Sequence, residues 1–79
     1  MFYTYVLRSN IDSNFYIGWT NDLKKRIKKH NKGEVTATKH RRPLTLVYYE
    51  ACLLEKKAIE REKQLKTGFG RAYLKKRTN

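Results

Sequence analysis

Residues typical of secreted and membrane-spanning proteins are scarce in this sequence. Its 79 residues include a single cysteine, Cys52, which cannot form a disulfide within the chain, so we expect a reducing compartment, the cytoplasm. No stretch approaches the roughly 20 apolar residues of a membrane span. Arg8 interrupts the apolar start of the chain, and no long apolar run follows it. We therefore expect a soluble, intracellular protein without a signal peptide.

Proline and glycine are also rare, with one and four copies respectively. The sequence contains no internal repeat, low-complexity stretch or linker, so residues 1–79 are expected to form one domain. A domain of this size buries only about 60% of the surface that its unfolded chain exposes. The core is therefore expected to be small.

Acidic residues are few: seven Asp and Glu face 19 Lys and Arg, which gives a formal net charge of +12. Such an excess bears on the partners of a protein rather than on its fold. Nucleic acid is the leading partner, an anionic membrane surface is the second, and a basic surface without a ligand is the third reading.

Three segments have the alternation or composition of β-strands: Phe2 to Arg8, Phe15 to Trp19 and Leu44 to Glu50. Turn residues join the first two segments, which predicts an antiparallel hairpin with Tyr5 and Tyr16 on neighbouring strands. Tyr3, Tyr5 and Leu7 are expected to share one face of the first strand. The fold class is therefore α+β, with a three-stranded antiparallel sheet flanked by helices.

Three helices are predicted, from about Asp22 to Asn31, from Ala51 to Lys66 and from Phe69 to Arg77. Thr20 or Asn21 is expected to cap the first, and Gly33 to stop it. Their apolar positions form the stripes that pack on the sheet: Leu23 and Ile27; Leu54, Ala58, Ile59 and Leu65; and Phe69, Ala72, Tyr73 and Leu74.

Two charged residues interrupt these stripes, Arg26 in the first helix and Glu62 in the second. They could pair with each other in a half-buried salt bridge, which often adds little stability. Alternatively they face one cleft, where Arg26 binds a phosphate group and Glu62 binds a hard cation such as Mg²⁺. Beside them, the phenols of Tyr5 and Tyr16 either pack in the sheet or act on water and phosphate. Gly18 marks either a close approach or only a strand end.

The ordered set Tyr3-Thr4-Tyr5, Tyr16-Ile17-Gly18, Arg26 and Glu62 resembles the GIY-YIG nuclease domain. The resemblance spans about Phe2 to Leu65 and is closest to the small single-domain bacterial members. Tyr3 and Thr4 replace the Gly and Ile of the first motif, and Trp19 stands where some relatives have lysine. The same module occurs in nucleases of DNA repair, in homing endonucleases and in restriction enzymes.

The resemblance implies a phosphodiesterase that acts on DNA with one divalent metal ion, Mg²⁺ or Mn²⁺. Tyr5 would act as general base or position the attacking water, and Tyr16 would bond to the phosphate or the water. Arg26 would stabilise charge on the scissile phosphate, and Glu62 would bind the metal, which acts as a Lewis acid.

Further basic residues are candidates for binding the nucleic-acid backbone. We expect this surface to bind without sequence preference, through the following residues and an extension on the third helix: Lys24, Lys25, His30, Lys39, Arg41 and Arg42. His30 is expected either to pack or to contact phosphate rather than to bind metal. The substrate could be plain DNA, branched DNA or RNA, and a protein partner could supply specificity. The alternative to an endonuclease is a non-catalytic nucleic-acid-binding module or an adaptor of the same fold.

Overall fold

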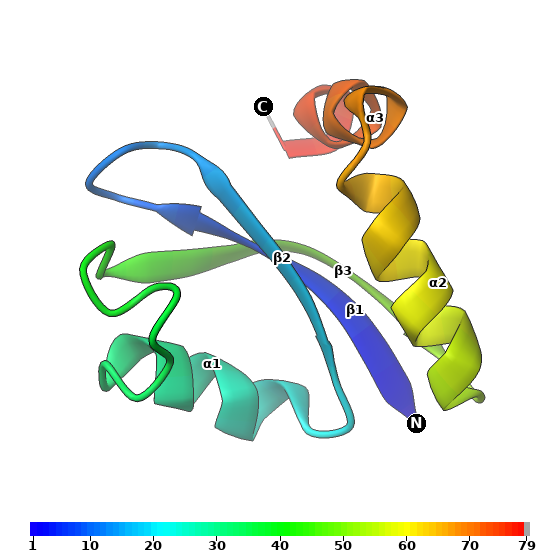
Figure 1. Cartoon of the computed structure of the whole chain (residues 1–79), viewed down its shortest axis with the longest axis horizontal. Coiled ribbons are helices and arrows are strands. Elements are labelled where there is room, and N and C mark those ends of the chain that lie inside the picture. Colours follow the sequence, from blue (N-terminus) through cyan, green and yellow to red (C-terminus); the bar gives the residue numbers. More distant parts are fainter. Residues whose placement is uncertain (79) are drawn as a thin grey trace.

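The computed structural model describes residues 1–78, and three strands form its centre (Figure 1). They are β1 (Phe2–Ser9), β2 (Phe15–Thr20) and β3 (Leu44–Cys52), arranged in the order β2-β1-β3 with both pairs antiparallel. The α+β class and the antiparallel three-stranded sheet are thus confirmed. All three strands extend one or two residues beyond their predicted ends.

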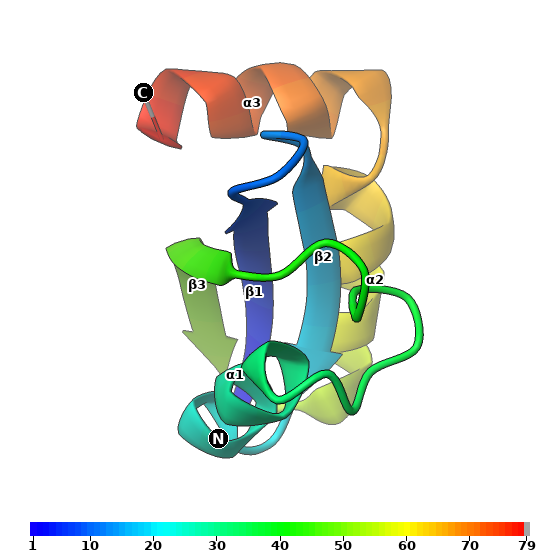
Figure 2. The same ribbon diagram turned by 90° about the vertical axis from the view of Figure 1, so that its left-hand side faces the viewer.

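Helices cover both faces of the sheet (Figures 1 and 2). They are α1 (Leu23–Asn31), α2 (Glu55–Leu65) and α3 (Gly68–Thr78). In Figure 2, α1 crosses in front of the strands, α2 runs along the far side of the sheet, and α3 lies across its upper end. No helix within residues 1–78 has both the length and the apolar character needed to cross a bilayer.

The alternation of β1 divides the core between the two faces. Tyr5 and Leu7 pack with Leu44 on the side of α1, and partly buried Leu23 and Ile27 of that helix lie against them. On the other side, the following side chains pack with residues of α2 and α3: Val6, Ile17, Leu65 and Leu74. Since strand side chains alternate between faces, β1 supplies both clusters.

Polar contacts fix the helices to the strands. The hydroxyl of Thr4 in β1 donates to the carbonyl oxygen of Ala58 in α2 at 2.8 Å. The side-chain amide of Asn31, at the end of α1, bonds to both backbone groups of Leu44, at 3.0 and 2.8 Å. Both helices therefore have a set position along the sheet as well as a buried face.

Two predicted helix starts are wrong. Asp22, rather than Thr20 or Asn21, caps α1, because its Oδ1 accepts the backbone N–H of Lys25 at 3.1 Å. The second helix begins at Glu55 rather than Ala51, because β3 continues to Cys52 in register with Phe2. The predicted stop of α1 at Gly33 is confirmed by its φ of 80°, a conformation that favours glycine.

The third helix packs through fewer residues than predicted. Leu74 is fully buried and Tyr73 partly buried, whereas Phe69 is 92% exposed and Ala72 is also exposed. Leu54 of the second predicted stripe is likewise exposed, because it precedes the helix as its N-cap residue. Leu54 and Phe69 both lie at the start of a helix, and the apolar period does not reveal where a helix begins.

We expect Leu74→Ala to test whether α3 is part of the core. Removing this buried side chain should cost about 2–5 kcal/mol of unfolding free energy, because it leaves a cavity. Leu53→Ala is the matched control, since Leu53 is 78% exposed, and its cost should stay within about 0.5 kcal/mol. Urea unfolding measures both values, and equal costs would contradict the packing of α3.

Candidate active site

Three aromatic rings from the hairpin and from α1 meet on one face of the sheet. The rings of Tyr5 and Tyr16 have centroids 6.5 Å apart, and the ring of His30 lies 5.7 Å from Tyr5 and 5.0 Å from Tyr16. Arg26 and His30 are four residues apart in α1, so their side chains share the helix face that covers Tyr5. The predicted proximity of Tyr5 and Tyr16 is confirmed.

Gly18 makes room for the phenol of Tyr5. The two residues are directly opposite in the β1–β2 register, and a Cβ on Gly18 would lie 2.6 Å from the Tyr5 hydroxyl oxygen and 2.8 Å from its Cζ. Any larger residue would displace the ring. Of the two alternatives for Gly18, close approach is therefore what the structure contains, and the approaching group is a side chain of the same domain.

A line of hydrogen bonds runs through the Tyr5 hydroxyl. Arg26 donates to it from Nε at 3.3 Å, and the hydroxyl lies 2.8 Å from Nε2 of His30. The other ring nitrogen of His30, Nδ1, lies 2.7 Å from Oγ1 of Thr38. Tyr5, His30 and Thr38 are all buried, whereas Arg26 is partly exposed, so the guanidinium forms part of the cover over Tyr5.

Burial and charge set the protonation states along this line. Burial and the positive charge of Arg26 lower the pKa of His30 to about 4, so its imidazole is neutral near pH 7. Burial raises the pKa of Tyr5, although the Arg26 bond and charge act against it, so the phenol keeps its proton. The hydrogen bond to Tyr5 is the main reason that the pKa of Arg26 is raised.

These states determine the direction of the hydrogen bonds. A guanidinium can only donate, so of the two side chains bonded to the Tyr5 oxygen only His30 can accept its proton. We therefore assign the Tyr5 proton to the bond with Nε2 of His30, and the single proton of the neutral imidazole to Nδ1, which donates to Thr38. A proton acceptor thus stands directly behind Tyr5.

Glu62 of α2 is linked to this site only through its charge, which is the smallest of the influences that raise the pKa of Tyr5. Its side chain is 19% exposed and pairs with Lys66 one turn later, with 2.8 Å between Oε2 and Nζ. The alternative salt bridge between Arg26 and Glu62 is absent from the part of the chain that the structure describes. The two interrupting charges of the sequence are therefore held by different partners.

A single carboxylate is compatible with a hard cation but not with a structural zinc site. Within residues 1–78 no three His, Cys, Asp or Glu side chains gather into a metal-binding group. Structural zinc sites need such a group, whereas a hard cation such as Mg²⁺ commonly binds through one or two carboxylates and completes its shell with water and substrate phosphate. Glu62 fits the second pattern because its side chain is partly exposed and its protein partner is a surface lysine.

The basic residues predicted to bind nucleic acid lie in separate places. Lys24 and Lys25 are exposed on α1. Lys39 and Arg42 line a shallow hollow beside Pro43. Arg41 turns the other way and forms a salt bridge with Asp12 in the β1–β2 turn, at 2.8 Å. The structure therefore does not bring these side chains into one patch.

Of the two roles predicted for His30, packing and phosphate contact, the structure shows packing. His30 is fully buried and both of its ring nitrogens are hydrogen-bonded within the protein, so its side chain does not contact a phosphate group. Thr38, which holds it, was not predicted, because it lies in a turn without hydropathic period, eight residues beyond the histidine. Only the position of His30 on the inner face of the helix could be inferred from the sequence.

Comparisons with known proteins identify the family of the chain. The model of the GIY-YIG catalytic domain matches residues 1–77. UPF0213 proteins of Bacillus pumilus and Clostridium perfringens are 41% and 43% identical over 66 and 67 residues. These matches cover 82% and 84% of this chain, and 66% and 71% of those relatives.

A solved relative has the same fold. The solution NMR structure of a UPF0213 protein from Bacillus halodurans matches with a TM-score of 0.57 and 32% identity, over 94% of this chain and 82% of that chain. The family match covers nearly the whole chain. The chain therefore belongs to the GIY-YIG family, and the resemblance noted in its motifs is confirmed.

The buried imidazole makes stability depend on pH. Since the folded-state pKa of His30 is about 4, below its ordinary value of 6.5, the unfolded chain binds more protons between these values. Stability is therefore full above pH 6.5 and falls as the pH drops towards 4, with about 2 kcal/mol lost from this residue between pH 7 and pH 5.

Urea unfolding at the two pH values measures this loss. In His30→Gln the loss should be smaller by that amount, whereas His40→Gln, which changes an exposed histidine, should keep it. The same pH dependence in both variants would contradict a buried, neutral His30.

Proposed function

We propose that this GIY-YIG protein is an endonuclease that hydrolyses phosphodiester bonds in DNA, with one divalent metal ion and weak sequence specificity. The observation that carries the proposal is the line of hydrogen bonds from partly exposed Arg26 through buried Tyr5 to buried His30. A role in DNA repair in the cytoplasm belongs to the same proposal.

Arg26 binds the scissile phosphate in this proposal. Its Nε donates to Tyr5, and among residues 1–78 its guanidinium takes part in no salt bridge. The Nη groups therefore remain to donate to a phosphate oxygen, where a planar guanidinium can form two parallel bonds. Donors of this kind stabilise the charge that develops on phosphorus-bound oxygens in the transition state.

Tyr5 and His30 remove the proton of the attacking water. As the Tyr5 oxygen accepts a proton from water, its own proton passes to Nε2 of His30, 2.8 Å away. Burial disfavours a free phenolate, and burial and Arg26 also disfavour the imidazolium, so the relay relies on the negative charge of the bound phosphate to offset that cost. The Thr38 hydroxyl can accept the proton of Nδ1, which leaves Nε2 to accept from Tyr5.

Access to Tyr5 depends on Arg26. The tyrosine is fully buried in the free protein, and the partly exposed guanidinium contributes to its cover. A phosphate that attracts Arg26 would lengthen the 3.3 Å bond to Tyr5 and admit water to its oxygen. Tyr16, which lies beside both rings and is partly exposed, is placed to bond to the same water or phosphate.

Glu62 would hold the metal ion, Mg²⁺ or Mn²⁺. Lys66 would then release the carboxylate, an exchange that is favourable because a divalent cation replaces a monovalent surface partner. A bound metal supplies Lewis-acid stabilisation of the leaving oxygen. The formal charge of +12 favours a polyanionic substrate and makes binding salt-dependent. Branched DNA, RNA and a protein partner that supplies specificity remain within the proposal.

Cleavage of a supercoiled plasmid and of branched DNA, each with Mg²⁺, Mn²⁺ or a chelator, tests the proposal. We expect metal-dependent products that fall about 10²-fold or more in Glu62→Gln and in Arg26→Ala. Tyr5→Phe should lower the rate by about 10²–10⁴-fold and leave DNA affinity unchanged, since it removes only the proton relay.

Glu55→Gln is the matched control for Glu62→Gln, because Glu55 lies exposed at the start of the same helix. Its cleavage rate should equal that of the unaltered protein. DNA binding without metal-dependent product would reject the endonuclease and favour a non-catalytic binding module. A stable protein complex that resists nuclease treatment would favour an adaptor.

A further inference from the structure

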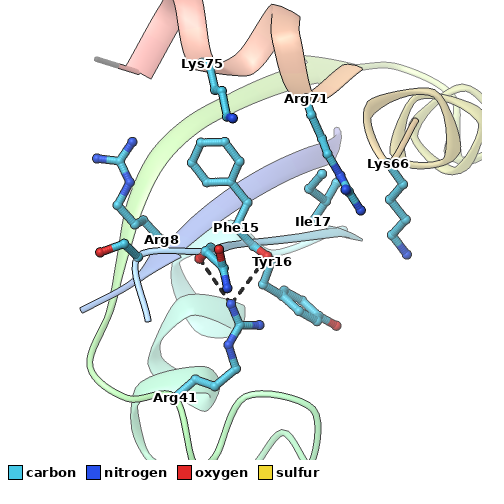
Figure 3. A pocket seen from close by; sticks show the side chains of 10 residues that line it. Arg8, Phe15, Tyr16, Ile17, Arg41, Lys66, Arg71 and Lys75 are labelled. Carbon is cyan, nitrogen blue, oxygen red and sulfur yellow. Dashed lines mark hydrogen bonds between the residues drawn. The ribbon is translucent and has the colours of Figure 1, made fainter. Parts of the chain in front are cut away.

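A basic groove shares Tyr16 with the aromatic cluster around Tyr5 (Figure 3). It has a volume of about 920 Å³ and lies between the β1–β2 hairpin, the loop that carries Arg41, and the helices α2 and α3. Because β2 is an edge strand, the groove passes around the free edge of the sheet. Its lining residues are Arg8, Ser13, Asn14, Phe15, Tyr16, Ile17, Arg41, Lys66, Arg71 and Lys75.

The charges of this groove have one sign. Five of the ten lining residues are Lys or Arg, and none is Asp or Glu. Lys66 and Arg41 have carboxylate partners outside the lining, whereas Arg71 and Lys75 form no salt bridge within residues 1–78. These two residues are one turn apart on α3, are exposed, and extend towards β2 in Figure 3. They are therefore available to an external anion.

Aromatic side chains stand among the cations. Phe15 and Tyr16 are consecutive in β2, so they line the groove from opposite faces of the sheet edge. The Phe15 ring packs in part against the core cluster on the α2 side, and its exposed part faces the groove, where the guanidinium of Arg8 lies 5.4 Å from the ring centroid. Cations that follow a phosphate backbone, combined with aromatic rings on which bases stack, are the pattern of single-stranded nucleic-acid binding.

The aromatic lining of the groove favours unpaired nucleotides over a duplex, because a ring stacks on bases that are not already stacked and paired within a duplex. The groove volume is that of a cleft for a small ligand, about 300–1,000 Å³, and a few nucleotides of one strand fit such a space. Since the groove shares Tyr16 with the aromatic cluster around Tyr5, a strand lying in it would continue to the guanidinium of Arg26.

We propose that this groove binds a single-stranded segment of the nucleic-acid substrate next to the bond that is cut. Arg71 and Lys75 contact its phosphates and Phe15 stacks on a base. The proposal rests on the proposed endonuclease function, whose substrate it makes more specific: the preferred DNA carries an unpaired flank, as in a flap or a frayed end.

Fluorescence polarisation with a labelled single-stranded oligonucleotide in chelator tests the groove without relying on cleavage. The slope of log K against log salt changes by about 0.7 for each phosphate contact on a single strand. In Arg71→Ala/Lys75→Ala the slope should therefore become shallower by about 1.4. Lys28→Ala/Lys29→Ala removes two exposed lysines of α1 and should leave the slope unchanged.

The same assay examines base stacking. Phe15→Leu keeps an apolar side chain but removes the ring, and it should weaken single-strand binding about fivefold or more. A blunt duplex of the same sequence should bind the unaltered protein more weakly than the single strand. Thermal unfolding confirms that each variant is folded.

Two results would overturn the inference. One is an unchanged salt slope in Arg71→Ala/Lys75→Ala, and the other is duplex binding at least as tight as single-strand binding. Either result leaves metal-dependent cleavage by the unaltered protein as a separate observation. Conversely, a protein that binds single strands through the groove but never cleaves DNA would fail the endonuclease proposal alone.

Discussion

The hydroxyl of Tyr5 is the atom on which the candidate site depends. This hydroxyl lies against Gly18, accepts a hydrogen bond from Arg26 and is within hydrogen-bonding distance of His30. The central strand, the edge strand and α1 must therefore be correctly placed for this one atom to be satisfied. Because the tyrosine is fully buried, loss of either partner would leave a polar group without compensation. Tyr5 is therefore needed both for the packing of β1 and for the proposed chemistry.

Several charges of the site are held by partners within the protein. Arg26 bonds to Tyr5, Glu62 to Lys66, and Arg41 to Asp12. The ion pairs of Glu62 and Arg41 are partly exposed, so each is weak enough to be exchanged for a metal ion or a phosphate. The domain can therefore remain folded without substrate and still offer its charges to a polyanion. In contrast, the bond between Tyr5 and His30 is buried and persists in both situations.

Alternation and helical period were sufficient to predict most of the fold. The strand pattern of Phe2 to Arg8 correctly separated Tyr5 from Val6, and with them the two halves of the core. The helix ends were less predictable: Asp22 replaced Thr20 or Asn21 as the cap, and Phe69 proved exposed. The ends of helices depend on the tertiary contacts of a few residues. A periodic sequence pattern does not reveal these contacts.

For the site, the sequence indicated charged residues in apolar stripes but not their partners. The proximity of Arg26 and Tyr5 follows from a helix that packs on the strand from which Tyr5 projects. The contact between His30 and Thr38 could not be inferred, because it joins a helix to a turn without periodic sequence. Burial then makes the imidazole neutral, and this property gives Tyr5 a proton acceptor. The ¹⁵N chemical shifts of the His30 ring, recorded between pH 5 and pH 8, measure this state. The account predicts a neutral ring throughout, with the proton on Nδ1; an imidazolium at pH 7, or a proton on Nε2, would contradict it.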